Sequence, residues 1–232
     1  MIIAWIIFAL ILIGLIIAGT AYTRLVKIID KYSNTTVKLG FKAIDFINVC
    51  NNSFDLNLKC AVSNKKLENA YAPKQKVVIV DKDLIDSKSI VAVSIVAHEI
   101  GHAIQDQNEN FLFRLDLFMK RVFRVLKFIA IPLAICGFVF LFIDGFRIYG
   151  EICLLVTVGV WIFSLITRIV TIPMEYQASN IAYGILRDNR LLTRNELKIT
   201  KKILNAAALT YVGAIFINLL NFFRAIKNSF KT

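Results

Sequence analysis

The sequence has few cysteines, few acidic residues and only two histidines. Its four cysteines form no Cys-x-x-Cys pair, and two of them lie in apolar runs. Neither a disulfide framework nor a cysteine zinc site is therefore indicated. The 16 acidic residues against 28 Lys and Arg residues give a formal net charge of +12. No recognised nucleic-acid-binding motif accompanies this charge, and the basic residues adjoin apolar stretches, so anionic headgroups are favoured over nucleic acid as partners.

Hydrophobic residues make up 57% of the 232 residues, and the mean hydropathy is +0.65. This composition is too apolar for an ordinary soluble fold and predicts a membrane protein. Ile2–Thr20 contains no charged residue and is long enough to span a bilayer as a helix. An N-terminal anchor is predicted, because the positive charges follow the run. A cleaved signal peptide is the alternative.

Three further apolar or uncharged runs follow later in the chain. Phe128–Ile143 and Ile152–Thr167 flank a short turn region and predict a transmembrane hairpin. Each run is slightly short for a bilayer, so a thinned membrane, snorkelling by Lys127 and Arg168, or a re-entrant hairpin stays open. Asn205–Phe223 lacks charge and predicts a C-terminal membrane helix.

Residues 24–127 form the largest polar stretch and predict a membrane-flanked domain. The apolar spacing predicts a helix around Phe41–Val49, followed by short strands near Leu56–Val62 and Lys76–Val80. A helix over Ile90–Gln107 is expected next, because three residues before it carry side chains that favour helix starts: Asp86, Ser87 and Ser89.

The distribution of basic residues predicts the orientation in the membrane. The hairpin turn holds only Arg147, so the positive-inside rule predicts a multi-pass protein of the cell membrane with its polar domain in the cytoplasm. If the last run spans, the basic tail lies outside, which disagrees with the rule. The larger cluster of basic residues therefore decides the predicted orientation. That cluster comprises Arg24, Lys27, Lys31, Lys120, Arg121, Arg124, Lys127 and Arg168.

The two histidines, His98 and His102, stand four residues apart, with Glu99 directly after the first. Residues four apart share one helix face, so both imidazoles can reach one metal ion. Imidazole is a good zinc ligand, and the neighbouring carboxylate can take a proton from zinc-bound water. Two unrelated histidines on an ordinary helix are the plain alternative. The uncharged stretch Ser89–Ala97 is too short to span, which favours an aqueous site close to the membrane.

A catalytic zinc site needs a third protein ligand, and the residues available favour a carboxylate. Glu175 is the only charged residue between Arg168 and Arg187, and an unpaired carboxylate in so apolar a run is costly unless it binds a cation. Pro173 suits the first turn of a helix, or a kink, which would place Glu175 at the start of a helix toward Leu186. A carboxylate that interacts with the helix dipole or with Arg168 is the alternative.

The spacing on this second helix also predicts how it meets the first. Ala178, Ser179 and Ala182 would share one face with Glu175, and such small residues allow close approach to the histidine helix. Gly101 is most simply a small packing position on that helix.

Three segments carry a resemblance to a known family: Val96–Gln105, Pro173–Ser179 and Ala206–Val212. They occur in this order around the anchor and the apolar hairpin, a combination far more specific than His-Glu-x-x-His alone. By these segments the chain resembles the YugP-like family of membrane-bound neutral zinc metallopeptidases and, more distantly, the HtpX-type membrane proteases. Gln177 stands where the family pattern has an aspartate, and Asn69–Pro73 departs from its Asp-His-Tyr-Asp-Pro segment.

The resemblance implies a zinc-dependent endopeptidase that acts on a peptide or protein substrate. It implies His98, His102 and Glu175 as the ligands of about one Zn²⁺ per chain, with Glu99 as the general base. The alternatives are a noncatalytic zinc-binding membrane protein that binds or scaffolds clients, and a zinc hydrolase acting on a different bond. Retention of Glu99 disfavours the noncatalytic alternative, because a structural site needs no base.

Other residues are candidates for supporting roles. Gln105 lies within a turn of His102 and could orient it, or be a structural amide. Gln177, at the position where the sequence departs from the family, could tune the ligands in the same way. The strand residues Val77, Val78, Ile79 and Val80 could pair with an extended substrate, or form a buried core strand. Because both histidines are expected to bind metal, the donor to an oxyanion must be another group, with four candidates: Tyr71, Tyr176, Tyr183 and Arg187.

The predicted fold is a mainly α-helical integral membrane protein with a zincin-like His-Glu-x-x-His helix and a small β element. Five regions are predicted along the chain: an N-terminal anchor (1–23), a cytoplasmic metallopeptidase region (24–127), a transmembrane hairpin (128–168), a cytoplasmic helical region with the third ligand (169–203), and a C-terminal membrane helix with its tail (204–232).

Overall fold

The computed structural model describes the backbone of residues 2–65 and 68–229, and side chains within 12–65 and 68–220. Met1 and Lys231, and the side chains of Arg224 and Lys227 in the predicted tail, lie outside these ranges. The predicted helical fold with a small sheet is confirmed. Its elements are α1 (Ile2–Tyr32), α2 (Ala43–Phe54), β1 (Lys59–Ser63), β2 (Ala70–Ala72), β3 (Val77–Asp81), α3 (Lys82–Ile85), α4 (Ile90–Gln107), α5 (Phe111–Phe140), α6 (Arg147–Asp188) and α7 (Arg194–Ser229).

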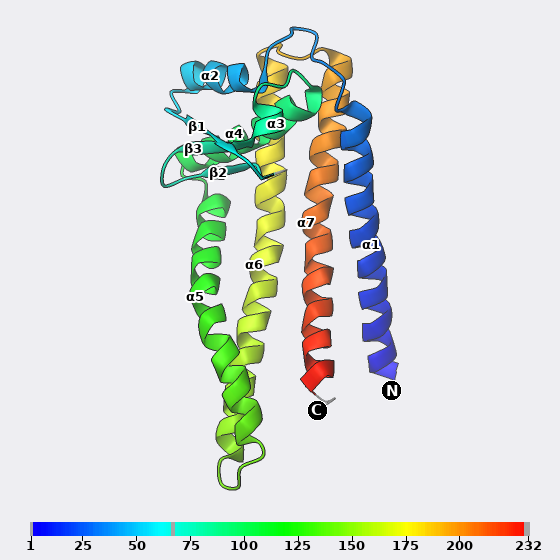
Figure 1. Ribbon diagram of the computed structural model, residues 1–232, viewed down its shortest axis with the longest axis vertical. Helices are drawn as coiled ribbons and strands as arrows, with labels where there is room; N and C mark the ends of the chain where they lie inside the picture. The colour runs from blue at the N-terminus through cyan, green and yellow to red at the C-terminus, as the bar shows by residue number, and fades with distance from the viewer. Residues whose placement is uncertain (1, 66–67, 230–232) are drawn as a thin grey trace.

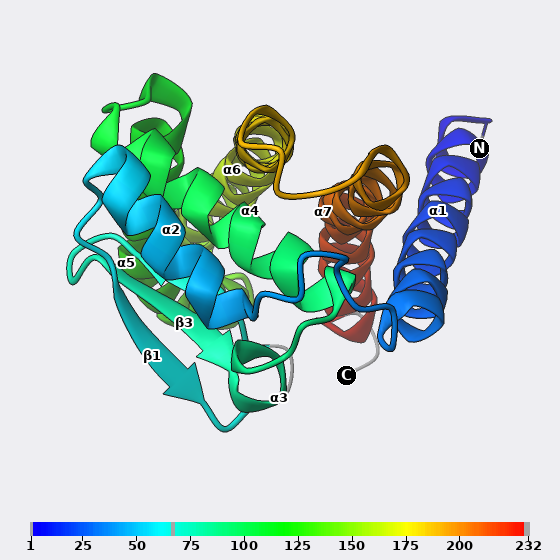
Figure 2. The ribbon, with the colours of Figure 1, turned by 90° about the horizontal axis from the view of Figure 1, so that it is seen from above.

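Four helices, α1, α5, α6 and α7, are long and apolar enough to cross a membrane. They run lengthwise beside one another, while α2, α3, α4 and the sheet gather at one end (Figure 1). The start of α1, the end of α7 and the turn between α5 and α6 lie at the opposite end. The view from above shows α7 between α1 and α6 (Figure 2), in agreement with their packing. The four long helices are therefore suited to a membrane, and the shorter helices and the sheet form one folded end.

The two helices α5 and α6 extend well beyond the apolar runs that predicted them. Helix α5 begins at Phe111, where the side chain of Asn110 accepts a hydrogen bond from the Phe113 N–H, and α6 continues to Asp188. They run through the predicted region boundaries at 127/128 and 168/169. Helices can extend past the apolar core because their backbone groups are satisfied internally, whatever the solvent.

Pro173 lies inside α6, so the prediction that a helix begins there is wrong. Proline removes only one backbone hydrogen bond, and the rest of the ladder continues on both sides of it. Packing of α6 against α4, α5 and α7 supports the uninterrupted helix. Glu175 is consequently a residue of a helix interior, which disfavours the alternative of a carboxylate at a helix terminus.

The sheet has the strand order β1-β3-β2, with β1 parallel and β2 antiparallel to β3. The predicted strand over Lys76–Val80 is confirmed, shifted by one residue, and Val78 and Val80 point into the core. Of the two alternatives for Val77, Val78, Ile79 and Val80, the structure favours the core strand over pairing with a substrate. Strand β3 is central, and β1 pairs with Val77–Asp81 on one edge while β2 pairs with Val77–Ile79 on the other.

Helix α4 passes through the centre of the polar end and has the predicted bounds. Ser89 caps it, its hydroxyl accepting a hydrogen bond from the Ala92 N–H at 3.1 Å, as the sequence predicts. The helix is buried on nearly every side, as expected for one that is apolar all round. It packs against α2, α6, α7 and β2, which fixes its position relative to the membrane helices.

Helices α4 and α6 meet at a backbone contact between Gly101 and Ala178. A Cβ atom added to Gly101 would overlap the Ala178 carbonyl oxygen and lie 3.0 Å from its carbonyl carbon. Ala178 and Ala182 are completely buried, and Ser179 is nearly so. The predicted small-residue face of α6 and the packing role of Gly101 are therefore confirmed.

We predict that Gly101→Ala lowers the free energy of unfolding by about 1–3 kcal/mol, because the added methyl must push two backbones apart. Thermal unfolding of the full chain in detergent measures the effect. The matched control is Gly159→Ala on α6, where no atom would lie within 4 Å of the new Cβ. Equal stability of the two variants would contradict the close contact.

Candidate metal centre

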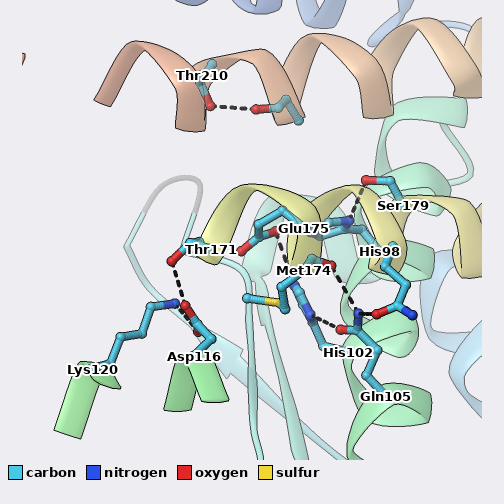
Figure 3. A network of polar contacts seen from close by, with 12 residues as sticks. His98, His102, Gln105, Asp116, Lys120, Thr171, Met174, Glu175, Ser179 and Thr210 are labelled. Atoms are coloured by element: carbon cyan, nitrogen blue, oxygen red, sulfur yellow. Dashed lines mark hydrogen bonds and ion pairs between the residues drawn. The ribbon is translucent and has the colours of Figure 1, made fainter. Parts of the chain in front are cut away.

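Three side chains from two helices converge at the crossing of α4 and α6. His98 and His102 lie one turn apart on α4, and Glu175 reaches them from α6 (Figure 3). The Glu175 Oε2 atom lies 3.0 Å from His98 Nε2 and 3.4 Å from His102 Nε2. One potential ligand atom from each residue lies within 4.8 Å of the others. The structure thus brings together the three residues that the sequence predicts as ligands.

The second nitrogen of each imidazole has its own partner. His98 Nδ1 lies 3.2 Å from the Ser179 hydroxyl, and His102 Nδ1 lies 3.0 Å from Gln105 Oε1. An amide oxygen can only accept, so His102 donates its Nδ1 proton to Gln105 and turns Nε2 toward the centre. Such a partner fixes both the tautomer and the ring orientation.

Gln105 is itself held in place by α6. Its side chain is 1% exposed, and its amide NH₂ donates to the Met174 carbonyl and to Gln177 Oε1, both at 3.0 Å. Gln177, which departs from the family pattern, therefore contributes an acceptor to this network. The predicted supporting position of Gln105 is found in the structure, and it joins His102 to the backbone of the helix that carries Glu175.

The donor set fits a zinc ion. Two ligands bound at about 2.0–2.1 Å to a tetrahedral ion lie about 3.4 Å apart, close to the distances between Glu175 and the two imidazoles. Two imidazoles and one carboxylate also form a known ligand set for catalytic zinc. Because each imidazole nitrogen facing away from the centre is already hydrogen-bonded, the nitrogens facing Glu175 are the ones available to an ion.

Glu99 lies beside this cluster and faces a cavity of about 200 Å³ that His102 and Glu175 also line. Its side chain is 8% exposed, and burial raises the pKa of its carboxyl even though both histidines and a backbone hydrogen bond from Tyr71 lower it. Burial alone would lower the pKa of His102, but Glu175, Glu99 and Gln105 together raise it, and the net shift is upward. Glu99 therefore presents a buried carboxyl group to a cavity that a small molecule could enter, beside His102 and Glu175.

Of the four predicted oxyanion donors, only Tyr71 lines this cavity, and its hydroxyl donates to Asp106 at 2.8 Å. Tyr176 is exposed, while Arg187 lies over the ring of Tyr183 at 5.9 Å. These three residues belong to a face of α6 rotated by about 100° from Glu175, because each residue advances about 100° around the helix axis. They are not among the described residues that line the cavity.

Tyr211 of α7 lines the cavity and was not among the predicted site residues. Tyr211 and Glu175 thus line the same space. The signal available in the sequence was its position inside Ala206–Val212, one of the segments that carry the family resemblance. Periodicity along one helix could not find it, because α7 reaches the site only through tertiary packing on α6.

Comparison with known proteins agrees with this site. The family described as "Putative neutral zinc metallopeptidase" matches residues 6–229. The chain is 30% identical over 162 residues to "Putative membrane protease YugP" of Bacillus subtilis (strain 168), which covers 69% of this chain and 68% of that protein. No solved structure matches the chain. The resemblance seen in the sequence is confirmed, zinc is the metal that the family implies, and the chain belongs to this family of zinc metallopeptidases.

Proposed function

We propose that the protein is a membrane-bound zinc endopeptidase that hydrolyses peptide bonds in peptide or protein substrates. The observation that carries the proposal is the convergence of His98, His102 and Glu175, with His102, Glu175 and the buried Glu99 lining one cavity. A purely structural zinc site would need the ligands but neither the adjacent carboxyl group nor the cavity. The crossing of α4 and α6 supports a zincin-like arrangement, with ligands on two helices and the base between them.

His98, His102 and Glu175 would hold the zinc ion, about one per chain. Bound there, zinc would supply a Lewis acid and a water molecule of lowered pKa. Ser179 and Gln105 keep the two imidazoles oriented toward the ion. Glu175, buried in α6, contributes the negative charge that makes the centre attractive to a dication.

Glu99 acts as the general base in this proposal. Its carboxylate takes a proton from the attacking water and returns it to the leaving amine. The Tyr211 hydroxyl donates a hydrogen bond to the substrate carbonyl oxygen, which stabilises the negative charge that develops on that oxygen. Both groups line the same cavity, so one bound peptide group could reach both.

Strand β2 is the part of the sheet best placed to receive the substrate backbone. It is an edge strand, it contacts α4, and its Tyr71 lines the cavity. An edge strand presents unpaired backbone groups to which an extended peptide can add. We therefore transfer the predicted role of substrate strand from β3 to β2.

We also propose that α1, α5, α6 and α7 cross the membrane, with α5 and α6 as a hairpin. The basic residues near the polar end support a cytoplasmic location for that end, by the positive-inside rule. The shared orientation of the helices then puts the start of α1 and the end of α7 on the outer side.

We predict that Glu99→Gln retains the zinc ion and lowers the rate of cleavage of casein, an unstructured protein, by at least about 100-fold, because the amide cannot accept the proton. Metal analysis and a cleavage assay on the full chain in detergent test this. Glu109→Gln, a change at an exposed glutamate, is the matched control. Undiminished cleavage with the metal retained would remove Glu99 from the base role, and no cleavage by the wild-type chain would favour the noncatalytic alternative.

We predict that Tyr211→Phe keeps the zinc content and KM nearly unchanged and lowers kcat by about 100-fold, because one donor to the developing oxyanion is lost. Steady-state kinetics with a peptide substrate separate the two constants. The matched change Tyr176→Phe alters an exposed ring on α6 and is expected to be silent. A fall in zinc affinity with unchanged kcat would instead assign Tyr211 to supporting Glu175.

A further inference from the structure

A second cavity of about 220 Å³ adjoins the one at the metal centre. It lies between α5, α6 and α7 on the membrane side of the centre, and its lining residues come from all three helices. Lys120 and Tyr211 line both cavities, so the two are neighbours that share these side chains at their boundary.

Two cations line this second cavity, and only one of them is neutralised by the protein. Lys120 pairs with Asp116 at 2.7 Å, and Asp116 is 1% exposed and also accepts a hydrogen bond from Thr171 at 2.5 Å (Figure 3). This buried carboxylate holds the ammonium group at the junction of the cavities. Arg168 also lines the cavity, and none of the carboxylates in the described part of the chain pairs with it.

Three other polar groups of the lining already have a partner in the protein. Thr171 donates to Asp116, Thr167 donates to the Phe163 carbonyl, and Ser164 accepts from Asn218. The guanidinium group of Arg168 and the remaining N–H donors of Lys120 are the cationic groups left to bind an occupant. Both are cationic donors, and together they carry one positive charge more than Asp116 neutralises. The cavity is thus complementary to a single anionic group.

We propose that this cavity is a substrate subsite that binds an acidic side chain of the cleaved polypeptide. Arg168 is suited to a carboxylate because its planar guanidinium can make two parallel hydrogen bonds to it. The proposal rests on the proposed peptidase function and names the class of substrate that the site would select. A substrate carboxylate is favoured over a lipid phosphate, because Lys120 and Tyr211 line both this cavity and the one that Glu99 faces.

The position of the acidic residue relative to the cleaved bond follows from α6. Arg168 and Glu175 lie on the same face of this helix, about two turns or about 10 Å apart. An extended peptide covers that distance in about three residues. The acidic residue should therefore lie about three positions from the cleaved bond, on one side of it only.

The test is the cleavage specificity of the full chain in detergent. Digests of casein and of a denatured soluble protein are mapped by mass spectrometry and aligned on the cleaved bonds. We expect Asp and Glu to be enriched about three positions away on one side. With matched synthetic peptides, Arg168→Glu should lower kcat/KM for the acidic peptide about fivefold relative to the neutral one and favour a peptide with Lys there. Arg121→Glu, an exposed charge reversal on the far face of α5, is the control and should leave the preference unchanged.

Several results would overturn the subsite. Cleavage that depends on Glu99 but shows no acidic preference would overturn it and leave the peptidase function standing, as would a preference that Arg168→Glu does not alter. Activity that depends on the fraction of anionic lipid in vesicles, and not on peptide charge, would assign the cations to headgroup phosphate. No cleavage by the wild-type chain would reject the peptidase function and the subsite with it. Arg168→Ala, judged folded by its zinc content, serves as a second variant and should lose the acidic preference.

Discussion

The backbone contact between Gly101 and Ala178 is the constraint on which the site depends. Helix α4 carries both imidazoles and Glu99, whereas the third potential ligand, Glu175, comes from α6, so neither helix contains a complete metal centre. The imidazoles on α4 and the carboxylate on α6 have fixed lengths, so they can bind the same ion only at a particular distance between the two helix axes. A glycine facing a buried alanine sets that separation by backbone contact, which is less deformable than contact between long side chains. Geometry of this kind has to hold within about 0.5 Å in a functional site.

The same crossing is reinforced by a buried polar network. Gln105 bonds His102 on its own helix and the Met174 carbonyl on the other, with Gln177 as a further acceptor. In a low-dielectric interior such bonds are strong when complete and costly when one partner is missing. The network therefore favours one rotation of α4 about its axis, the rotation that presents both Nε2 atoms to Glu175. Stability of the helix pair and orientation of the imidazoles are consequently coupled.

The local parts of the site and its long-range ligand Glu175 could be predicted from sequence, whereas the contributions of α7 and of strand pairing could not. Helical periodicity and a serine cap predict α4 and the shared face of His98 and His102, and the isolation of Glu175 in an apolar run marks it as unusual. Tyr211 lies on α7, and the hydrophobic pattern within α7 does not predict which helix it packs against. The central position of β3 depends on strand pairing, which alternation within one strand does not encode. The rotation of Tyr183 away from Glu175 follows from helix geometry and could have been derived from the predicted helix toward Leu186.

The continuity of α6 through Pro173 has a further consequence for the proposed function. A helix that began at Pro173 would have separated Glu175 from Arg168, because a loop between them would leave their relative direction undefined. In one helix the two residues share a face, with Thr171 between them hydrogen-bonded to Asp116. Helix α6 therefore fixes the proposed metal centre and the proposed anion-binding subsite relative to one another. A substrate that reaches both must be extended where it meets the membrane end of the domain, since a folded chain could not enter between α5, α6 and α7.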